Sequence, residues 1–129
     1  MGNGSFSSVK WSITIGVNPG YNNKTQEYIP DDEFATACRK IAQEVEDETS
    51  VYISCVFYRS RVVYKTEWGC PEEGEFTNTL TGSCNPEFCK DIDKYIEAVE
   101  MFAKKLKEEY KQSTILLEIV PMNAMYLKD

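Results

Sequence analysis

One short segment of the chain, Trp68-Gly69-Cys70-Pro71-Glu72-Glu73-Gly74-Glu75, concentrates the side chains that could do chemistry. Cys70 is a candidate nucleophile, and Glu72 and Glu75 are a candidate general acid/base pair. The chain contains no histidine, so no imidazole can activate a thiol, hold a metal or complete a Ser-His-Asp triad. None of these residues has the spacing of a catalytic motif. Catalysis through Cys70 or through Glu72 and Glu75 is therefore an alternative and not the leading hypothesis.

The same segment is better suited to binding a ligand. Trp68 beside Gly69 offers a flat ring next to open backbone, and the carboxylates can accept hydrogen bonds. A second polar loop, residues 18–30, adds possible donors. We expect a small polar ligand at the edge formed by loops 18–30 and 69–84, bound by Asn18, Tyr21, Trp68, Gly69, Cys70, Glu72 and Glu75. The alternative is that Trp68 ends a core strand and that the glutamates form a solvated turn.

Five cysteines are an odd number for a chain large enough to fold without disulfides. This favours a reducing, cytoplasmic environment. Cys38 and Cys55 fall in apolar patterns and should be small buried hydrophobes. Cys70, Cys84 and Cys89 lack the spacing of a zinc site, so we expect free thiols, no metal and no cofactor, with a disulfide among these three or a zinc site as alternatives.

The charge balance limits the possible partners. The chain has 14 basic and 21 acidic residues and a net charge of −7, which disfavours a protein that tracks nucleic-acid phosphates. No apolar run approaches the roughly 20 residues of a membrane span, and the N-terminus does not resemble a secretory signal. The partners expected instead are a small polar ligand, a basic protein surface or further copies of the chain.

The elements that would position these residues follow from hydrophobic periodicity. Alternating patterns predict strands, and apolar stripes at steps of three and four predict two helices. Arg59-Ser60 would be the turn of a hairpin, and Asn85-Pro86 would begin the second helix. The predicted order is strand 11–17, helix 31–48, strands 51–58 and 62–68, an irregular loop 69–84, helix 85–110 and a last strand 113–121.

This order predicts one α+β domain over residues 1–129, with a flexible N-terminus over residues 1–10 and a C-terminal tail or short extra strand over residues 121–129. The βαββαβ pattern is that of ferredoxin-like domains, with sheet order 4-1-3-2 and both helices on one face. We expect strands 1 and 3 to be parallel neighbours. That arrangement would bring loops 18–30 and 69–84, and the N-termini of both helices, to the same edge.

The sheet face opposite the helices is predicted to be unusually apolar. Such patches mark interfaces, so we expect a homo-oligomer, a dimer or larger. The predicted interface residues are Trp11, Tyr52, Val56, Tyr58, Val63, Leu116 and Val120. The alternative is that the C-terminal tail folds back over this face.

Together these features favour a non-catalytic, oligomeric binding module that sequesters or senses a small polar, nucleotide-like ligand. One alternative is a small acidic inhibitor that occupies a basic groove of a protein partner, of the kind used by phages or mobile elements in counter-defence. A second alternative is a small enzyme that uses Cys70 or Glu72 and Glu75.

Overall fold

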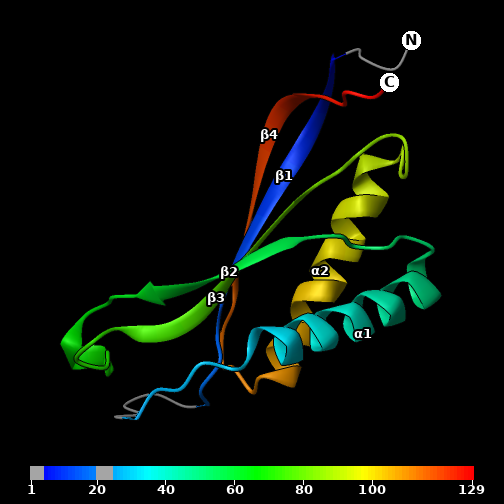
Figure 1. Cartoon of the computed structure of the whole chain (residues 1–129). Coiled ribbons are helices and arrows are strands. Elements are labelled where there is room, and N and C mark those ends of the chain that lie inside the picture. The colour runs from blue at the N-terminus through cyan, green and yellow to red at the C-terminus, as the bar shows by residue number, and fades with distance from the viewer. Residues whose placement is uncertain (1–4, 20–24) are drawn as a thin grey trace.

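The computed structural model describes residues 5–19 and 25–129. Figure 1 shows the path of the chain. Its elements are β1 (Ser5–Gly16), α1 (Asp31–Thr49), β2 (Val56–Val62), a 3₁₀ turn (Thr66–Trp68), β3 (Glu75–Ser83), α2 (Ile92–Glu109) and β4 (Leu116–Met125).

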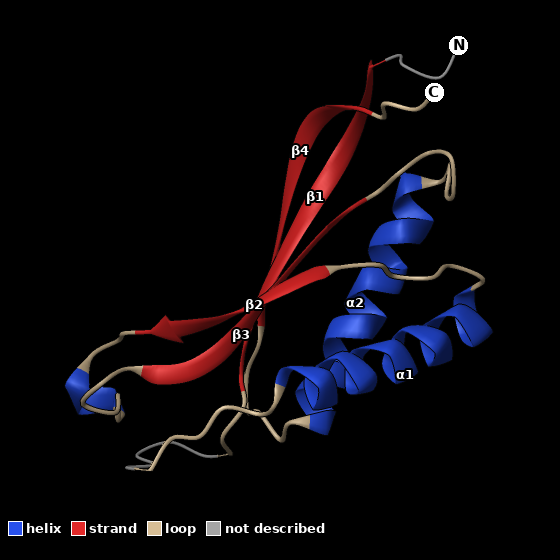
Figure 2. Cartoon of the chain, viewed as in Figure 1, coloured by secondary structure: helices blue, strands red, loops and turns tan. Residues whose placement is uncertain are grey.

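The four strands form one sheet in the order β2-β3-β1-β4, and every pair of neighbours is antiparallel. Both helices lie on the same side of this sheet (Figure 2). The α+β fold and the predicted strand order are therefore confirmed, since 4-1-3-2 is the same order counted from the other edge. The expectation that strands 1 and 3 are parallel is wrong. The β2–β3 hairpin reverses the chain, so β3 runs against both β2 and β1.

The hairpin has a different register from the one predicted. Arg59 and Ser60 lie within β2, opposite Asn78 and Thr77 of β3, and not at a turn. The chain reverses over residues 63–74 instead. Two glycines with positive φ make this possible, Gly69 at 97° and Gly74 at 89°, because side chains rarely tolerate that conformation.

Two segments predicted as irregular contain strand, and part of the expected C-terminal tail or short extra strand continues β4. Residues 75–83 of the supposed loop 69–84 form β3, residues 5–10 belong to β1, and β4 continues to Met125. The reason is that each segment pairs with a neighbour: β1 pairs with β4 from Ser5 opposite Met125 to Thr14 opposite Leu116. The hydrogen-bonded ladder thus extends well beyond the apolar core.

The second helix begins later than Asn85-Pro86 predicted. Asn85 begins a separate turn, in which the Phe88 N–H donates to the Asn85 carbonyl at 2.9 Å. Asp91 caps α2 by accepting from Lys94 N–H at 3.1 Å. The N-termini of α1 and α2 lie at opposite ends of the sheet, because α1 follows β1 and α2 follows the antiparallel β3. The expectation that the two helix N-termini share an edge is therefore wrong.

The core lies between the sheet and the helices. It is formed by buried side chains of β1 and β3 packed against the apolar faces of α1 and α2, including Ile13, Ile15, Leu80, Phe34 and Phe102. Trp11 belongs to this core, at 1% exposure, and not to the open face as predicted. Its Nε1–H donates to Tyr95 Oη at 2.8 Å, and its ring meets Phe102 edge-on. Strand alternation requires this, since Trp11 shares the parity of Ile13 and Ile15.

All five cysteines are free thiols. Cys38 is buried and Cys55 is half-buried against the core. Burial raises the pKa of Cys38 to about 12 and that of Cys55 to about 11. Both remain neutral apolar packing groups at physiological pH.

Candidate functional site

A ladder of hydroxyl groups lines the sheet face that no helix covers. Thr14 Oγ1 lies 3.1 Å from Thr79 Oγ1, and Ser60 Oγ lies 2.8 Å from both Thr77 Oγ1 and Thr79 Oγ1. Thr77 and Thr79 are nearly inaccessible although they face away from the core. This hydroxyl ladder connects polar side chains of β1, β3 and β2 on the face that no helix covers.

A groove of roughly 590 Å³ opens above the end of this ladder. That volume is ordinary for a site that binds a small molecule. The strand ends, the β2–β3 connection and the α2–β4 connection together form its walls. Its lining residues are Thr14, Gly16, Val62, Tyr64, Trp68, Glu75, Thr77, Gln112, Ser113, Thr114, Ile115, Leu116 and Glu118.

Glu75 is a titratable group of this groove whose pKa is shifted by its surroundings. It is the first residue of β3 and lies opposite Val62. Burial raises the pKa of Glu75 above its ordinary value of 4.5, and a hydrogen bond from the Tyr64 side chain opposes that rise. A partly desolvated carboxylate in a cleft marks a candidate functional group. A second carboxylate, Glu118 of β4, lines the same groove and is exposed.

Gly16 leaves room for Glu75 and for a second oxygen. A Cβ at this position would come within 3.0 Å of Glu75 Oε2 and of Gln112 Oε1. Both side-chain oxygens therefore converge on the small volume above the Gly16 backbone. Glycine within a strand often marks such a close approach, and here the approaching groups are polar and line the groove.

The segment before α1 holds the start of β3 in place. Phe76 N–H donates to Gln26 Oε1 at 3.0 Å, and the Phe76 ring stacks on Tyr28 with centroids 4.3 Å apart. Guanidinium groups of Arg59 and Arg61 lie 4.7 Å from the Tyr28 and Phe76 ring centroids, respectively. Because Phe76 directly follows Glu75, this stack of rings and guanidinium groups fixes the backbone that carries the groove carboxylate.

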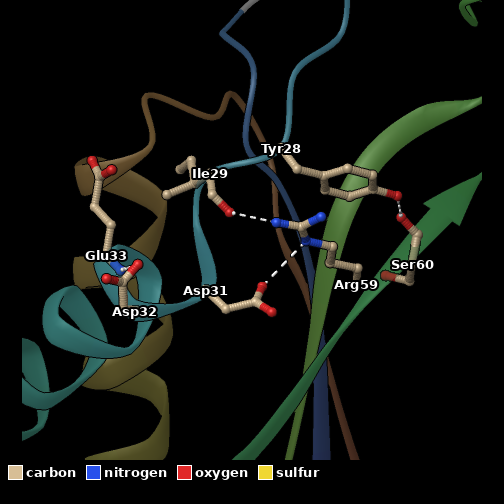
Figure 3. Close-up of polar contacts among 7 residues, drawn as sticks. All are labelled: Tyr28, Ile29, Asp31, Asp32, Glu33, Arg59 and Ser60. Atoms are coloured by element: carbon tan, nitrogen blue, oxygen red, sulfur yellow. Dashed lines mark hydrogen bonds and ion pairs between the residues drawn. The ribbon is translucent and has the colours of Figure 1, made fainter.

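Arg59 ties this stack to the first turn of α1 (Figure 3). Its Nε donates to Asp31 Oδ1 at 3.2 Å and its Nη2 to the Ile29 carbonyl at 3.4 Å. Tyr28 Oη donates to the Ser60 carbonyl at 2.9 Å. The segment 25–30 is thus bound to β2 at several points, on the helix side of the sheet.

The predicted ligand-binding residues separate into two groups. Trp68 and Glu75 line the groove, and Trp68 is 68% exposed. Asn18 is buried and its side chain is used internally: Nδ2 donates to Gln26 Oε1 and to the Glu27 carbonyl, and Oδ1 accepts from Glu27 N–H. Tyr21 lies outside the described residues.

The remaining predicted residues shape the β2–β3 connection. Gly69 is buried and ends the 3₁₀ turn, where its N–H donates to the Thr66 carbonyl at 2.9 Å. Cys70 Sγ accepts from Tyr64 N–H at 3.4 Å. Glu72 is exposed and does not line the groove. The structure therefore does not bring Glu72 and Glu75 together in the groove as an acid/base pair.

Most of the predicted interface residues are exposed, whereas Trp11 is buried. Val56 and Tyr58 of β2 and Leu116 and Val120 of β4 are open to solvent, as is Val63 just beyond β2. Tyr52 precedes β2 and lines a small hollow beside Cys38 of α1. The C-terminal tail does not cover these side chains; Lys128 instead pairs with Glu87 at 2.9 Å.

The sequence analysis did not identify Tyr64, Gln112, Gly16 or the hydroxyl ladder as parts of the site. Two signals could have revealed part of this site. Thr77, Thr79 and Thr81 alternate with period two, which is typical of a strand, and Gly16 stands between the β-branched residues Ile15 and Val17. The sequence around Gln112 shows no comparable pattern, because only the packing of the α2–β4 connection brings this residue to the groove.

Within residues 5–19 and 25–129, no group of three His, Cys, Asp or Glu side chains is placed to hold a metal ion. No helix in those ranges is long and apolar enough to cross a membrane.

Two solved structures resemble this fold. A phage SAM lyase in complex with S-methyl-5′-thioadenosine superposes with a TM-score of 0.58 at 15% identity, over 92% of this chain and 90% of that one. A phage SAM lyase in the apo state gives a TM-score of 0.57 at 16% identity, over 98% and 92%. At such identities the likeness shows the fold alone. No curated protein matches the chain in sequence.

The family comparison overturns the function expected from the sequence. A sequence model of the SAM lyase family matches residues 6–128, nearly the whole chain. Lyases are enzymes, so the expectation of a non-catalytic binding module is wrong. The absence of histidine misled the prediction, because it excludes imidazole chemistry but not catalysis by other groups. The chain belongs to the SAM lyase family.

Proposed function

We propose that this protein cleaves S-adenosylmethionine and releases S-methyl-5′-thioadenosine from the groove that contains Glu75. Family membership supports this reaction, and the related phage enzyme was solved with that thioether bound. The observation in this chain that carries the proposal is the groove itself, which combines aromatic surface from Tyr64 and Trp68 with the carboxylates Glu75 and Glu118.

The two molecules define which bond breaks. The substrate sulfur carries a methyl group, the adenosyl C5′ and the Cγ of the aminobutyrate chain. The thioether retains the first two, so the S–Cγ bond breaks and its electron pair neutralises the sulfonium. A lyase adds no water, so a new bond to Cγ must come from within the four-carbon fragment itself.

Two routes balance this step. In the first, the substrate α-carboxylate oxygen bonds to Cγ and forms a five-membered lactone, with no proton transfer. In the second, a base removes a Cβ proton and a double bond forms. A Cβ–H is a very weak acid, and a carboxylate such as that of Glu75 is a weak base for removing its proton. The groove therefore favours the lactone, which requires orientation more than a strong base.

The charge of the groove suits such a substrate. S-adenosylmethionine carries a sulfonium and an ammonium against one carboxylate, so it is cationic overall. Glu75 and Glu118 oppose that charge, while the open ring of Trp68 offers a stacking surface for the adenine. Partial burial strengthens these interactions, because the local dielectric is lower than in water.

We also propose that the chain is a phage protein that acts in the cytoplasm as a homo-oligomer. The phage origin of the two structural neighbours supports the source. Exposed Leu116 lines the groove, and exposed Val63 is adjacent in sequence to groove residues, so a second copy could cover that side. Light scattering coupled to size exclusion tests the oligomer, and a monomeric mass would contradict it.

The reaction is tested by incubating the purified protein with S-adenosylmethionine and measuring S-methyl-5′-thioadenosine by chromatography. Mass spectrometry of a briefly incubated sample should identify the four-carbon product as the lactone. Absence of the thioether would contradict the proposed function. Homoserine that carries the oxygen of labelled water in its hydroxyl group, and not in its carboxyl group, would show hydrolysis at Cγ instead.

Glu75→Gln and Glu72→Gln form a matched pair of variants. Both remove one carboxylate, from positions only three residues apart, but only Glu75 lines the groove. We expect kcat/KM to fall ~10–100-fold for Glu75→Gln, the effect of losing a hydrogen bond to a charged group. Glu72→Gln should leave it unchanged. Equal effects from both variants would argue against the groove as the active site.

A further inference from the structure

We propose that Gln112 is a specificity-determining residue, whose side-chain oxygen acts with Glu75 to bind the α-ammonium group of the substrate. This inference rests on the proposed function, because it assigns one part of the substrate to one part of the same groove. It concerns a residue of the α2–β4 connection that shows no sequence pattern of its own.

The hydrogen bonds of Gln112 determine which of its atoms faces the groove. Nε2 donates to the Asn18 carbonyl at 3.0 Å and to the Tyr110 carbonyl at 3.0 Å. Only the amide nitrogen can donate to two carbonyl oxygens, which fixes the orientation of the amide. Oε1 must then point away from those carbonyls, and it lies beside Gly16 within the groove lining.

Two acceptors meet at this point. Oε1 of Gln112 and Oε2 of Glu75 both lie within 3.0 Å of the position that a Cβ of Gly16 would occupy. Both side chains line the groove, so a ligand can reach the pair. A carboxylate and an amide oxygen together favour a cationic group with several N–H donors, which describes an ammonium.

The chemistry of the reaction selects between the two cations of the substrate. The sulfonium loses its charge as the S–Cγ bond breaks, so an acceptor that holds it tightly would stabilise the ground state and slow the step. The ammonium keeps its charge from substrate to product. An acceptor pair on the ammonium can therefore orient the adjacent carboxylate toward Cγ without that cost.

The anchors of Gln112 make the pair rigid. The Asn18 side chain is held by Gln26 and Glu27, and Gln112 N–H donates to the Lys107 carbonyl at 3.0 Å at the end of α2. The amide is thus fixed between the end of β1 and the end of α2. A fixed acceptor loses little side-chain entropy when a ligand binds.

Binding of two ligands that differ only at the amino group tests this assignment. S-adenosylhomocysteine carries the ammonium but no sulfonium, and its desamino analogue lacks both. We expect calorimetry on the wild-type chain to show tighter binding of S-adenosylhomocysteine. Gln112→Leu should weaken its binding about tenfold and leave the desamino analogue unchanged, the loss expected for one hydrogen bond to a charged group.

Gln112→Lys separates recognition from anchoring. A lysine ammonium can still donate to the Asn18 and Tyr110 carbonyls, but it accepts nothing and repels a ligand cation. If Gln112 binds the ammonium, both variants lose the preference for S-adenosylhomocysteine. If Gln112 only joins the segment after β1 to the end of α2, Gln112→Lys should keep the wild-type preference for S-adenosylhomocysteine. That result would overturn the proposal. Thermal midpoints of both variants establish that they are folded.

Two other results would also overturn the assignment. A wild-type chain that shows no preference between the two ligands has no ammonium site. Equal weakening of both ligands in Gln112→Leu would assign Gln112 to the nucleoside or to the fold. Neither result depends on turnover, so they are distinct from a failure to release S-methyl-5′-thioadenosine, which would contradict the proposed function.

Discussion

The two faces of the sheet use alternate residues of the same strands for opposite purposes. On the helix side, Trp11, Ile13 and Ile15 of β1 are sealed beneath α1 and α2. On the other side, Thr14 of the same strand joins a hydroxyl ladder that leads to the Glu75 groove. The first face gains stability from apolar area removed from water, and the second retains polar groups that a ligand can use. The comparison predicts that stability and activity can be changed separately.

The largest effect is expected on the sealed face. Phe102 is fully buried and meets Trp11 edge-on, so Phe102→Ala should leave a cavity and destabilise the fold by about 3–5 kcal/mol. Urea unfolding followed by fluorescence measures this change. Activity per folded molecule should stay near that of the wild type, and a large loss of specific activity would break the separation between the faces.

Gly16→Ala should produce the opposite result. Its Cβ would displace Glu75 Oε2 and Gln112 Oε1, which are the ends of flexible side chains and can move at little cost to the fold. We expect kcat/KM to fall ~10-fold or more, comparable to losing one hydrogen bond to a charged group, with almost no change in the urea midpoint. Unchanged activity would show that the convergence of these oxygens is not needed for catalysis.

The hydroxyl ladder should make a smaller contribution. Ser60→Ala removes the partner shared by Thr77 and Thr79, both buried. The expected cost is about 1 kcal/mol, since Thr79 keeps its contact with Thr14 and only Thr77 loses its hydroxyl contact in the ladder. Thermal unfolding measures this cost. The control variant is Ser54→Ala, because Ser54 is exposed and lies outside the hydroxyl ladder. A cost near zero would mean that water replaces the Ser60 hydroxyl.

The smallest effect is the pH dependence that Glu75 adds to stability. Burial raises its pKa above 4.5, so the folded state holds the proton more tightly than the unfolded chain does. The contribution of this group to stability therefore decreases as pH rises from 4.5 through the raised pKa. Glu75→Gln should lack that decrease, and comparing thermal midpoints of both proteins across this interval tests it. Activity should rise over the same interval as the carboxylate ionises, and a rate that falls instead would require a protonated Glu75.

The arrangement of the fold was predictable because it depends on redundant patterns. Apolar stripes such as Phe34, Cys38, Ile41 and Val45 define a helix face several times over, so one misplaced boundary does not change the topology. The hairpin register was not predictable from the same evidence. In the segment 51–62, both the odd-numbered and the even-numbered positions contain apolar residues. Only pairing with β3 decides which of them face the helices.

The candidate site was only partly predictable for the same reason. Trp68 and Glu75 were identified because they lie in one unusual segment, whereas Tyr64, Gln112 and Glu118 come from three separate connections and strands. Asn18 was assigned to a ligand because polar loop residues often bind one, but here its side chain satisfies backbone and amide groups of the following loop. Local sequence does not show whether a polar side chain has an internal partner.

The sequence by itself determined the α+β class, the strand order and the absence of imidazole chemistry, because these follow from periodicity and composition. The tertiary structure decided which carboxylate lines the groove. Glu72 and Glu75 are chemically equivalent and three residues apart, yet Glu72 is in solvent and Glu75 is partly desolvated beside Gly16 and Gln112. The difference arises because β3 begins at Glu75, and strand pairing carries that one residue onto the open face above β1.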